Sequence, residues 1–124
     1  MRRLALPIVA LAFAAAVPAQ AAAPLARMQV VAVEFHYQLS RMSVPAGQVR
    51  IELANFGQDE HDLTLQRVGG TTVYQVPKAL PGQRRLLDVR LKPGLYLLSC
   101  SMADHAARGM HAQLRVLPPK RPRR

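Results

Sequence analysis

The chain is poor in several residue types, and each shortage narrows the functions open to it. Of its 124 residues only one is cysteine, none is tryptophan, and seven are acidic. A single cysteine leaves its thiol without a disulfide partner in the chain. No serine–histidine–aspartate arrangement and no pair of carboxylates stands out, so the sequence predicts a protein that is not an enzyme.

The first 21 residues have the three parts of a secretory signal peptide. Arg2 and Arg3 give a positive start, residues 4–17 form an apolar run, and Ala19-Gln20-Ala21 offers an A-x-A cleavage site. Spanning a bilayer takes roughly 20 apolar residues, so the run favours a cleaved signal, with an uncleaved anchor as the alternative. We therefore expect residues 1–21 to direct export to the periplasm, with no stable membrane insertion after cleavage.

The remaining chain divides into one domain and a short tail. Residues 22–117 are the length of a single domain and leave no room for a second. Residues 118–124 combine prolines with like charges, so we expect this tail to be disordered. We expect the mature protein to be a monomer.

The shortage of acidic residues makes the chain strongly basic. Its formal charge is +10, and +8 once Arg2 and Arg3 are removed. Export separates the chain from nucleic acid, the basic residues are scattered outside the tail, and only Phe and Tyr could stack on bases, so we expect no nucleic-acid partner. The charge instead favours acidic protein partners or anionic membrane surfaces, unless it serves solubility alone.

Hydrophobic residues alternate with polar ones along the mature chain, as in half-buried β-strands. The stretches with this alternation or with strand-like composition are residues 28–37, 49–54, 61–66, 84–91, 95–100 and 112–117. Turn signals such as Pro81-Gly82 and Lys92-Pro93-Gly94 separate them. With no long helical stretch, the pattern predicts an all-β sandwich or barrel. Residues 67–83 are compatible with a short strand around 72–76 or with a loop.

One segment near the C-terminus carries three residues that bind soft metals. Cys100, His105 and Met110 follow the spacing Cys-x4-His-x4-Met, and His61 stands upstream in an alternating stretch. Two imidazoles, a thiolate and a weak axial thioether form the ligand set of a mononuclear blue-copper centre. Strand phase places His61 and Cys100 on core-facing positions, so both can meet at one end of a sandwich.

These residues also have structural interpretations. A lone cysteine is commonly a small buried hydrophobe, but an unpaired thiol oxidises easily in an oxidising compartment, where metal ligation would protect it. Methionine often fills a core, and we expect Met102 to pack or to face solvent rather than to bind metal. We expect His36 and His111 to be surface or packing residues, and Asp62 and Asp104 to be solvated charges.

At these positions the chain resembles the cupredoxins, in particular the small periplasmic blue-copper proteins of the plastocyanin and azurin kind. The likeness runs over residues 30–117 and rests on three segments: Val33-Glu34-Phe35 followed by residues 42–47, Asn55-Phe56-Gly57 with His61-Asp62-Leu63, and Pro93-Gly94-Leu95-Tyr96 leading to Cys100, His105 and Gly109-Met110. The resemblance implies a Greek-key β-sandwich of about 7–8 strands. It also implies one copper ion per chain, with His61, Cys100 and His105 as equatorial ligands and Met110 as the axial ligand.

The resemblance implies roles for two further groups. Asn55 would hydrogen-bond across to the loop that bears Cys100, and His105 would be the exposed imidazole through which electrons enter and leave. The chain departs from the family pattern at Ala103-Asp104, because proteins with this loop length usually carry Pro-Gly there. The two-copper site of oxidases needs a second cysteine in the loop, and the chain has none.

These inferences predict a type 1 (blue) copper protein that acts as a soluble periplasmic electron carrier. Its partners would be redox proteins, with acidic docking surfaces if the net charge steers them. The alternative is a periplasmic copper-binding protein for copper delivery, storage or tolerance, which the same four ligands would serve. A third interpretation is a β-sandwich that only interacts with other proteins, and loss of all metal binding would favour it.

We predict that the mature protein begins at Ala22. Cleavage after Ala21 follows from the positive start, the apolar run and the small-residue site. Mass spectrometry of protein purified from a periplasmic extract should give the mass of residues 22–124. An intact Met1 on membrane-bound material would contradict this prediction.

Overall fold

The computed structural model describes residues 14–19 and 25–121, and within these ranges the chain forms nine β-strands and no helix. The strands are β1 (Ala26–Val33), β2 (His36–Leu39), β3 (Ser43–Pro45), β4 (Gly47–Asn55), β5 (His61–Arg67), β6 (Val73–Ala79), β7 (Arg84–Leu91), β8 (Gly94–Ser99) and β9 (His111–Leu117). The predicted all-β class is confirmed. In the described ranges no helix is long and apolar enough to cross a membrane.

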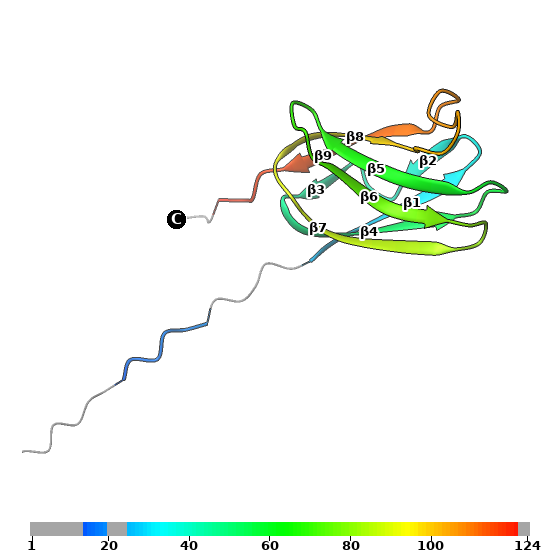
Figure 1. Cartoon of the computed structure of the whole chain (residues 1–124). Helices are drawn as coiled ribbons and strands as arrows, with labels where there is room; N and C mark the ends of the chain where they lie inside the picture. The colour runs from blue at the N-terminus through cyan, green and yellow to red at the C-terminus, as the bar shows by residue number, and fades with distance from the viewer. Residues whose placement is uncertain (1–13, 20–24, 122–124) are drawn as a thin grey trace, which may run out of the picture.

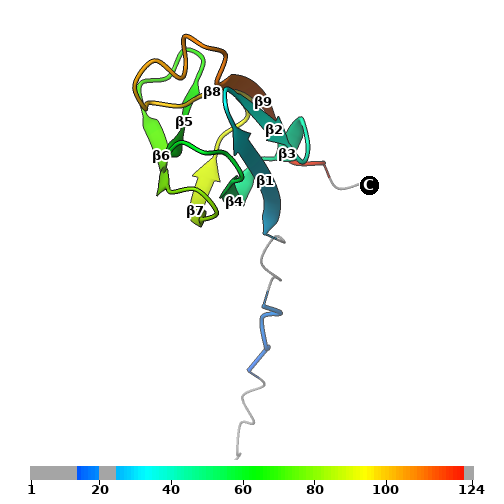
Figure 2. The same ribbon diagram turned by 90° about the vertical axis from the view of Figure 1, so that its right-hand side faces the viewer.

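The strands form two mixed sheets that pack face to face (Figures 1 and 2). One sheet has the order β2-β1-β4-β7 and the other the order β3-β9-β8-β5-β6. Two neighbouring pairs are parallel, β1 with β4 and β3 with β9, and the others are antiparallel. Since many neighbours are not consecutive in the chain, the connections cross between the sheets, which confirms the predicted sandwich.

The alternation in the sequence describes the core well. In β4, Val49, Ile51 and Leu53 are fully buried, while the residues between them are only partly covered. The same phase buries Tyr96 and Leu98 in β8. Each strand therefore presents one apolar face to the space between the sheets, and burial of this area is the main favourable term in folding.

The structure differs from the strands expected from periodicity in two places. Residues 28–37 are not one strand, because the chain turns at Glu34 and Phe35 and returns antiparallel as β2. Periodicity did not predict strand β3, since three residues are too few to show a pattern, although the strand lies within residues 42–47, which the family resemblance included. For the ambiguous stretch 67–83 the strand interpretation is confirmed, because it contains β6, a seven-residue strand paired with β5.

Three loops gather at one end of the sandwich: residues 56–60, residues 80–83 and residues 100–110 (Figure 1). Strand β1 begins and strand β9 ends at the opposite end. Residues 118–121 are exposed and form no regular secondary structure. Most of the predicted signal peptide, residues 1–13 and 20–21, and the last three residues of the tail lie outside the described ranges.

Candidate metal centre

The predicted ligands come from two neighbouring strands and the loop that follows one of them. His61 is the first residue of β5, and Cys100 follows the last residue of β8. Because β5 and β8 are antiparallel neighbours, the start of one and the end of the other lie at the same end of the sheet. His105 lies inside the loop after β8, and Met110 immediately precedes β9.

Three of these side chains converge on one point. One donor atom from each of His61, Cys100 and His105 lies within 4.8 Å of the other two. The Sγ atom of Cys100 is 3.6 Å from Nδ1 of His105. All three residues are buried, with exposed fractions of 0%, 2% and 7%. Burial also raises the pKa of the Cys100 thiol, so the free thiol keeps its proton at neutral pH.

Backbone hydrogen bonds close the loop that bears His105 and Met110. Cys100 N donates to the carbonyl oxygen of Met110 over 3.0 Å, and Met110 N donates to that of His105 over 3.1 Å. His105 N donates in turn to the carbonyl oxygen of Met102 over 3.0 Å. Met110 is fully buried. The loop thus keeps its shape through its own main chain and brings Met110 to the same end of the sandwich as the other three residues.

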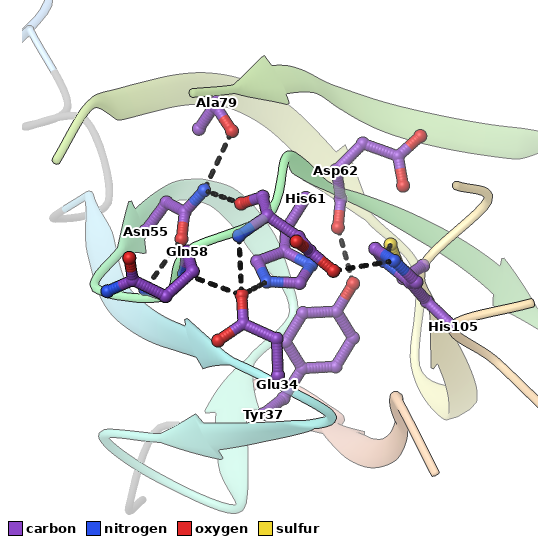
Figure 3. Close-up of polar contacts among 11 residues, drawn as sticks. Glu34, Tyr37, Asn55, Gln58, His61, Asp62, Ala79 and His105 are labelled. Carbon is purple, nitrogen blue, oxygen red and sulfur yellow. Dashed lines mark hydrogen bonds and ion pairs between the residues drawn. The ribbon is translucent and has the colours of Figure 1, made fainter. Parts of the chain in front are cut away.

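The two nitrogen atoms of His61 have different surroundings. Nδ1 is buried and has no hydrogen-bond partner, whereas Nε2 lies 3.0 Å from Oε1 of Glu34 (Figure 3). A buried polar atom without a partner costs free energy, and a metal ion bound there would remove that cost. A metal-binding histidine usually donates its other N–H to a carboxylate or carbonyl group, which is the arrangement that Glu34 provides.

The carboxylate of Glu34 is itself held by the loop before His61. Its Oε1 accepts hydrogen bonds from the backbone N–H groups of Gln58 and Asp59, each over 2.7 Å. Hydrogen bonding, first from Asp59, lowers the pKa of Glu34 from 4.5 to about 2. Gly57 leaves space for this carboxylate, because a Cβ atom there would lie 2.3 Å from Oε1. Sequence reasoning missed Glu34, since 27 positions separate it from His61 and no local pattern links them.

Asp62 ties the two ligand-bearing segments together, a role that the resemblance implied for Asn55. One carboxylate oxygen of Asp62 accepts a hydrogen bond from Ser101 N over 2.7 Å, and the other accepts from the Ser101 hydroxyl. Gln75 also donates to this carboxylate, over 2.8 Å. The expectation that Asp62 is a solvated charge was therefore wrong, because these neighbours leave it 1% exposed. The first residue after Cys100 is thereby fixed to the residue after His61.

Asn55 instead stabilises the loop that leads to His61. Its Nδ2 donates to the carbonyl oxygens of Asp59 and Ala79 over 2.7 and 2.9 Å, and its Oδ1 accepts from Gly57 N. No hydrogen bond joins its side chain to the segment around Cys100 among the described residues. The implied hydrogen bond from Asn55 to the loop that bears Cys100 was therefore wrong, and Asn55 holds the loop before His61 instead (Figure 3).

Tyr37 connects the opposite sheet to the same site. Its hydroxyl donates a hydrogen bond to the backbone oxygen of Asp62 (Figure 3). Burial raises the pKa of Tyr37, so the phenol remains neutral and keeps its donor. This contact links β2 to β5 and holds the two sheets together at the end where the ligands lie.

His105 is more buried than the resemblance implied. Its ring packs between Phe35 and His61, at centroid distances of 5.1 and 5.0 Å. Its Nε2 lies 3.5 Å from a carboxylate oxygen of Asp59. The ring also lines a surface cavity of about 470 Å³. The imidazole therefore reaches the surface through this cavity rather than by protruding into solvent.

The remaining sequence-derived candidates lie away from the cluster. His36 and His111 are exposed, as predicted, and Met102 is half-buried against the core. Asp104 is exposed and pairs with Arg108 over 2.8 Å, in keeping with a solvated charge. The guanidinium of Arg108 lies 4.6 Å from the centre of the Phe35 ring.

The donor set fits copper. Imidazole nitrogen and thiolate sulfur suit copper, and a buried thioether beside a His₂Cys group is typical of blue-copper sites. The unpaired, buried Nδ1 of His61 and the short approach of Cys100 to His105 are the two observations that show a place for an ion. Carboxylates contact the imidazoles on their outer nitrogens and so lie outside the donor set.

Comparison with known proteins finds one family. A family model described as a cupredoxin-like domain matches residues 4–111. No curated protein sequence matches the chain. Among solved structures, the auracyanin of Roseiflexus castenholzii, determined after dithionite reduction, has a TM-score of 0.61 at 14% identity and covers 79% of this chain and 100% of its own. Auracyanin B has a TM-score of 0.62 at 16% identity, with coverages of 82% and 94%.

A larger protein shares the same fold. A multicopper oxidase matches with a TM-score of 0.57 at 17% identity, covering 74% of this chain, while the chain spans only 44% of that oxidase. A reduced variant of amicyanin gives a TM-score of 0.55 at 18% identity, with coverages of 72% and 80%. Because these identities are low, the structural matches show that the chain shares the fold of these proteins and nothing more.

Replacing Glu34 by glutamine should destabilise the protein even without metal. Glutamine lacks the negative charge of the oxygen that takes part in three hydrogen bonds. We therefore expect the free energy of unfolding at neutral pH to fall by about 1–2 kcal/mol. In the wild type this contribution is present above pH 4.5 and is lost as the pH falls toward 2. Urea unfolding of the metal-free protein over that range checks both expectations.

Glu52→Gln is the matched control, because Glu52 is an acidic residue paired with Arg84 away from the ligands. Nitrogen NMR of His61 in the same proteins should show the proton on Nε2 in the wild type and a mixture of tautomers in Glu34→Ala. Equal stability of Glu34→Gln and Glu52→Gln, with His61 unchanged, would contradict the assigned role.

Proposed function

This chain belongs to the cupredoxin-like family, and from that premise we propose that it is a soluble periplasmic electron carrier. The chain binds one copper ion, and the observation that carries the proposal is the buried group of His61, Cys100 and His105 with donor atoms within 4.8 Å of one another. An ion in that group would accept one electron and give it back. The blue-copper proteins among the structural neighbours support this function.

We assign four ligands. His61 would bind through Nδ1, because its Nε2 contacts Glu34. His105 would bind through Nδ1, the atom nearest the sulfur of Cys100. Met110, fully buried at the end of the same loop, would supply the axial thioether. Because burial keeps the Cys100 thiol protonated, metal binding at neutral pH would release a proton.

The protein's contribution is a site whose shape is set before metal binds. Glu34 orients His61, Asp62 fixes the segment that begins at Cys100, and main-chain hydrogen bonds close the loop around His105. Cu(I) and Cu(II) differ in the geometry that they prefer, and a fixed donor arrangement lets one site hold both. Little atomic movement is then needed when an electron enters or leaves.

We further propose that the protein is not itself an enzyme. The likeness to a multicopper oxidase covers less than half of that oxidase, and the described residues contain one group able to hold a metal ion. Copper delivery is the alternative function. Met102 lines the cavity next to His105 and adds a second thioether near the surface, which a Cu(I) donor could use.

Copper loading should give one equivalent per chain and an intense blue colour. The charge-transfer absorption would come from the Cys100 thiolate, so Cys100→Ser should abolish it, while His61→Ala should reshape the spectrum and weaken binding. Titration of the purified mature protein with Cu(II), followed by visible spectroscopy, checks these outcomes. A colourless wild-type protein with copper bound would contradict the electron-carrier proposal and favour delivery.

Met110→Leu tests the axial assignment. Leucine keeps a similar volume in this buried position, so the fold and the colour should persist. Loss of a donor that helps stabilise Cu(II) should raise the reduction potential by on the order of 60 mV, which for one electron is about 1.4 kcal/mol. Protein-film voltammetry measures the shift, with Met102→Leu as the control. An unchanged potential in Met110→Leu would show that Met110 only fills the core.

A further inference from the structure

The cavity beside His105 has mainly apolar walls and an acidic rim. Loop residues 58–60 form one side, Leu80 and Pro81 form a second, and Met102 and Ala103 form a third. His105 lies at its inner surface with Nε2 on the side of Asp59, while Nδ1 faces Cys100. One aromatic ring therefore separates the cavity from the metal-binding group, and an occupant of the cavity would contact the ring directly.

Charge is distributed unevenly along the molecule. Five of its seven acidic residues lie at the end that holds the metal-binding group: Glu34, Asp59, Glu60, Asp62 and Asp104. Several basic residues lie at or near the opposite end, among them Arg27, Arg67, Arg90 and Lys92. The strongly positive net charge therefore does not describe the surface around His105.

At the metal-binding end three basic residues are paired with acidic ones: Arg84, at the start of β7, contacts Glu52 over 2.6 Å, and two others lie closer to the cavity. Lys78 contacts Glu60 over 2.8 Å, and Arg108 contacts Asp104 over 2.8 Å. Arg85, next to Arg84, is exposed and makes no ion pair among the described residues. Unlike Glu60 and Asp104, Asp59 makes no ion pair with a lysine or arginine in the part of the chain that the structure describes, and its side chain is 51% exposed. A carboxylate without a cationic partner thus stands on the rim of an apolar cavity, 3.5 Å from the outer nitrogen of His105.

We propose that this cavity is the docking site of a protein redox partner that inserts a lysine or arginine into it. The cationic head would pair with Asp59, and the aliphatic stem would lie against Leu80 and Pro81, as long basic side chains commonly pack. One electron would then pass between the partner's redox group and the copper centre, so that the donor is oxidised and the acceptor is reduced. His105 would lie at the contact between the two proteins. This inference rests on the proposed electron-carrier function and adds the chemistry of the partner.

Net charge leads to the opposite expectation. A formal charge of +8 on the mature chain would steer an acidic partner toward the protein as a whole. Charges beyond a Debye length of roughly 8 Å are screened at physiological salt, so the basic residues at the far end act weakly at the cavity. Local complementarity then decides which group docks beside His105, and among the residues that line the cavity the acidic group without a cationic side-chain partner is the carboxylate of Asp59.

A pair of matched partners separates these two expectations. One is a reduced c-type cytochrome whose haem edge is ringed by lysines, and the other is the same cytochrome after lysine acetylation. We would titrate each into isotope-labelled, Cu(I)-loaded mature protein at physiological ionic strength and follow the backbone NMR signals. Docking as proposed should shift the signals of residues 58–60 and 102–105 with the lysine form, and acetylation should weaken binding by roughly tenfold.

Asp59→Asn should weaken binding of the lysine form by a similar factor, roughly tenfold. Asp88→Asn is the control, since Asp88 carries the same charge but pairs with Arg50 on β7, and it should change binding by less than about twofold. The rate at which the reduced cytochrome reduces the Cu(II) protein, measured by stopped flow, should likewise be lower for Asp59→Asn than for Asp88→Asn and the wild type. Reduction by hydroquinone, which is neutral, corrects for any change in driving force caused by Asp59→Asn.

Different results would overturn the proposed docking site and the proposed electron-carrier function. Tighter binding of the acetylated cytochrome, with shifts away from the cavity and no effect of Asp59→Asn, would overturn the docking proposal and favour an acidic partner. A copper-loaded protein that cannot be cycled reversibly by voltammetry would overturn the electron-carrier function, whatever the NMR titration shows. Shifts at the cavity that persist equally in Asp59→Asn would show that the apolar walls bind without the charge, and would also overturn the proposed cation pairing.

Discussion

The antiparallel pairing of β5 with β8 is the constraint on which the metal centre depends. It sets the start of one strand beside the end of the other, so two donors that are far apart in the chain meet without any long connection between them. The carboxylate of Asp62 continues this pairing past the last ladder contact, because it accepts from both the amide and the hydroxyl of Ser101. The loop that carries the other donors starts from this fixed point.

The polar groups around the metal centre form two shells, an inner one of metal-facing atoms and an outer one of carboxylates. The inner atoms face one another, and each imidazole has a carboxylate at its outer nitrogen, Glu34 for His61 and Asp59 for His105. Glu34 shows the principle, since two backbone N–H groups and one imidazole share a single oxygen atom. In a low-dielectric interior such a network is stable only when each member is satisfied. The exception is Nδ1 of His61, and that exception marks where the ion belongs.

Much of this arrangement could be predicted from the sequence. Period-2 alternation identified the core of β4, β5 and β8, because side chains on a strand alternate strictly between faces. The spacing of Cys100, His105 and Met110 reflects a single loop, so it is visible locally. The supporting residues were not visible, since Glu34 and Asp62 act across strand pairs through contacts that only the three-dimensional register creates. The strand break at Glu34 was missed for a different, local reason, because the apolar residues Val33 and Phe35 on either side of it are typical of a continuous strand.

Gly57 has a consequence for how this protein tolerates change. It lies in the loop before His61 and donates no metal ligand, yet any side chain there would occupy the space of the Glu34 carboxylate. The effect would pass from Gly57 to Glu34, then to the ring of His61, and so to the ion. Substitutions of Gly57 should therefore lower the affinity for the metal as well as the stability of the fold. A survey of random variants should find position 57 among those at which most substitutions cause loss of copper.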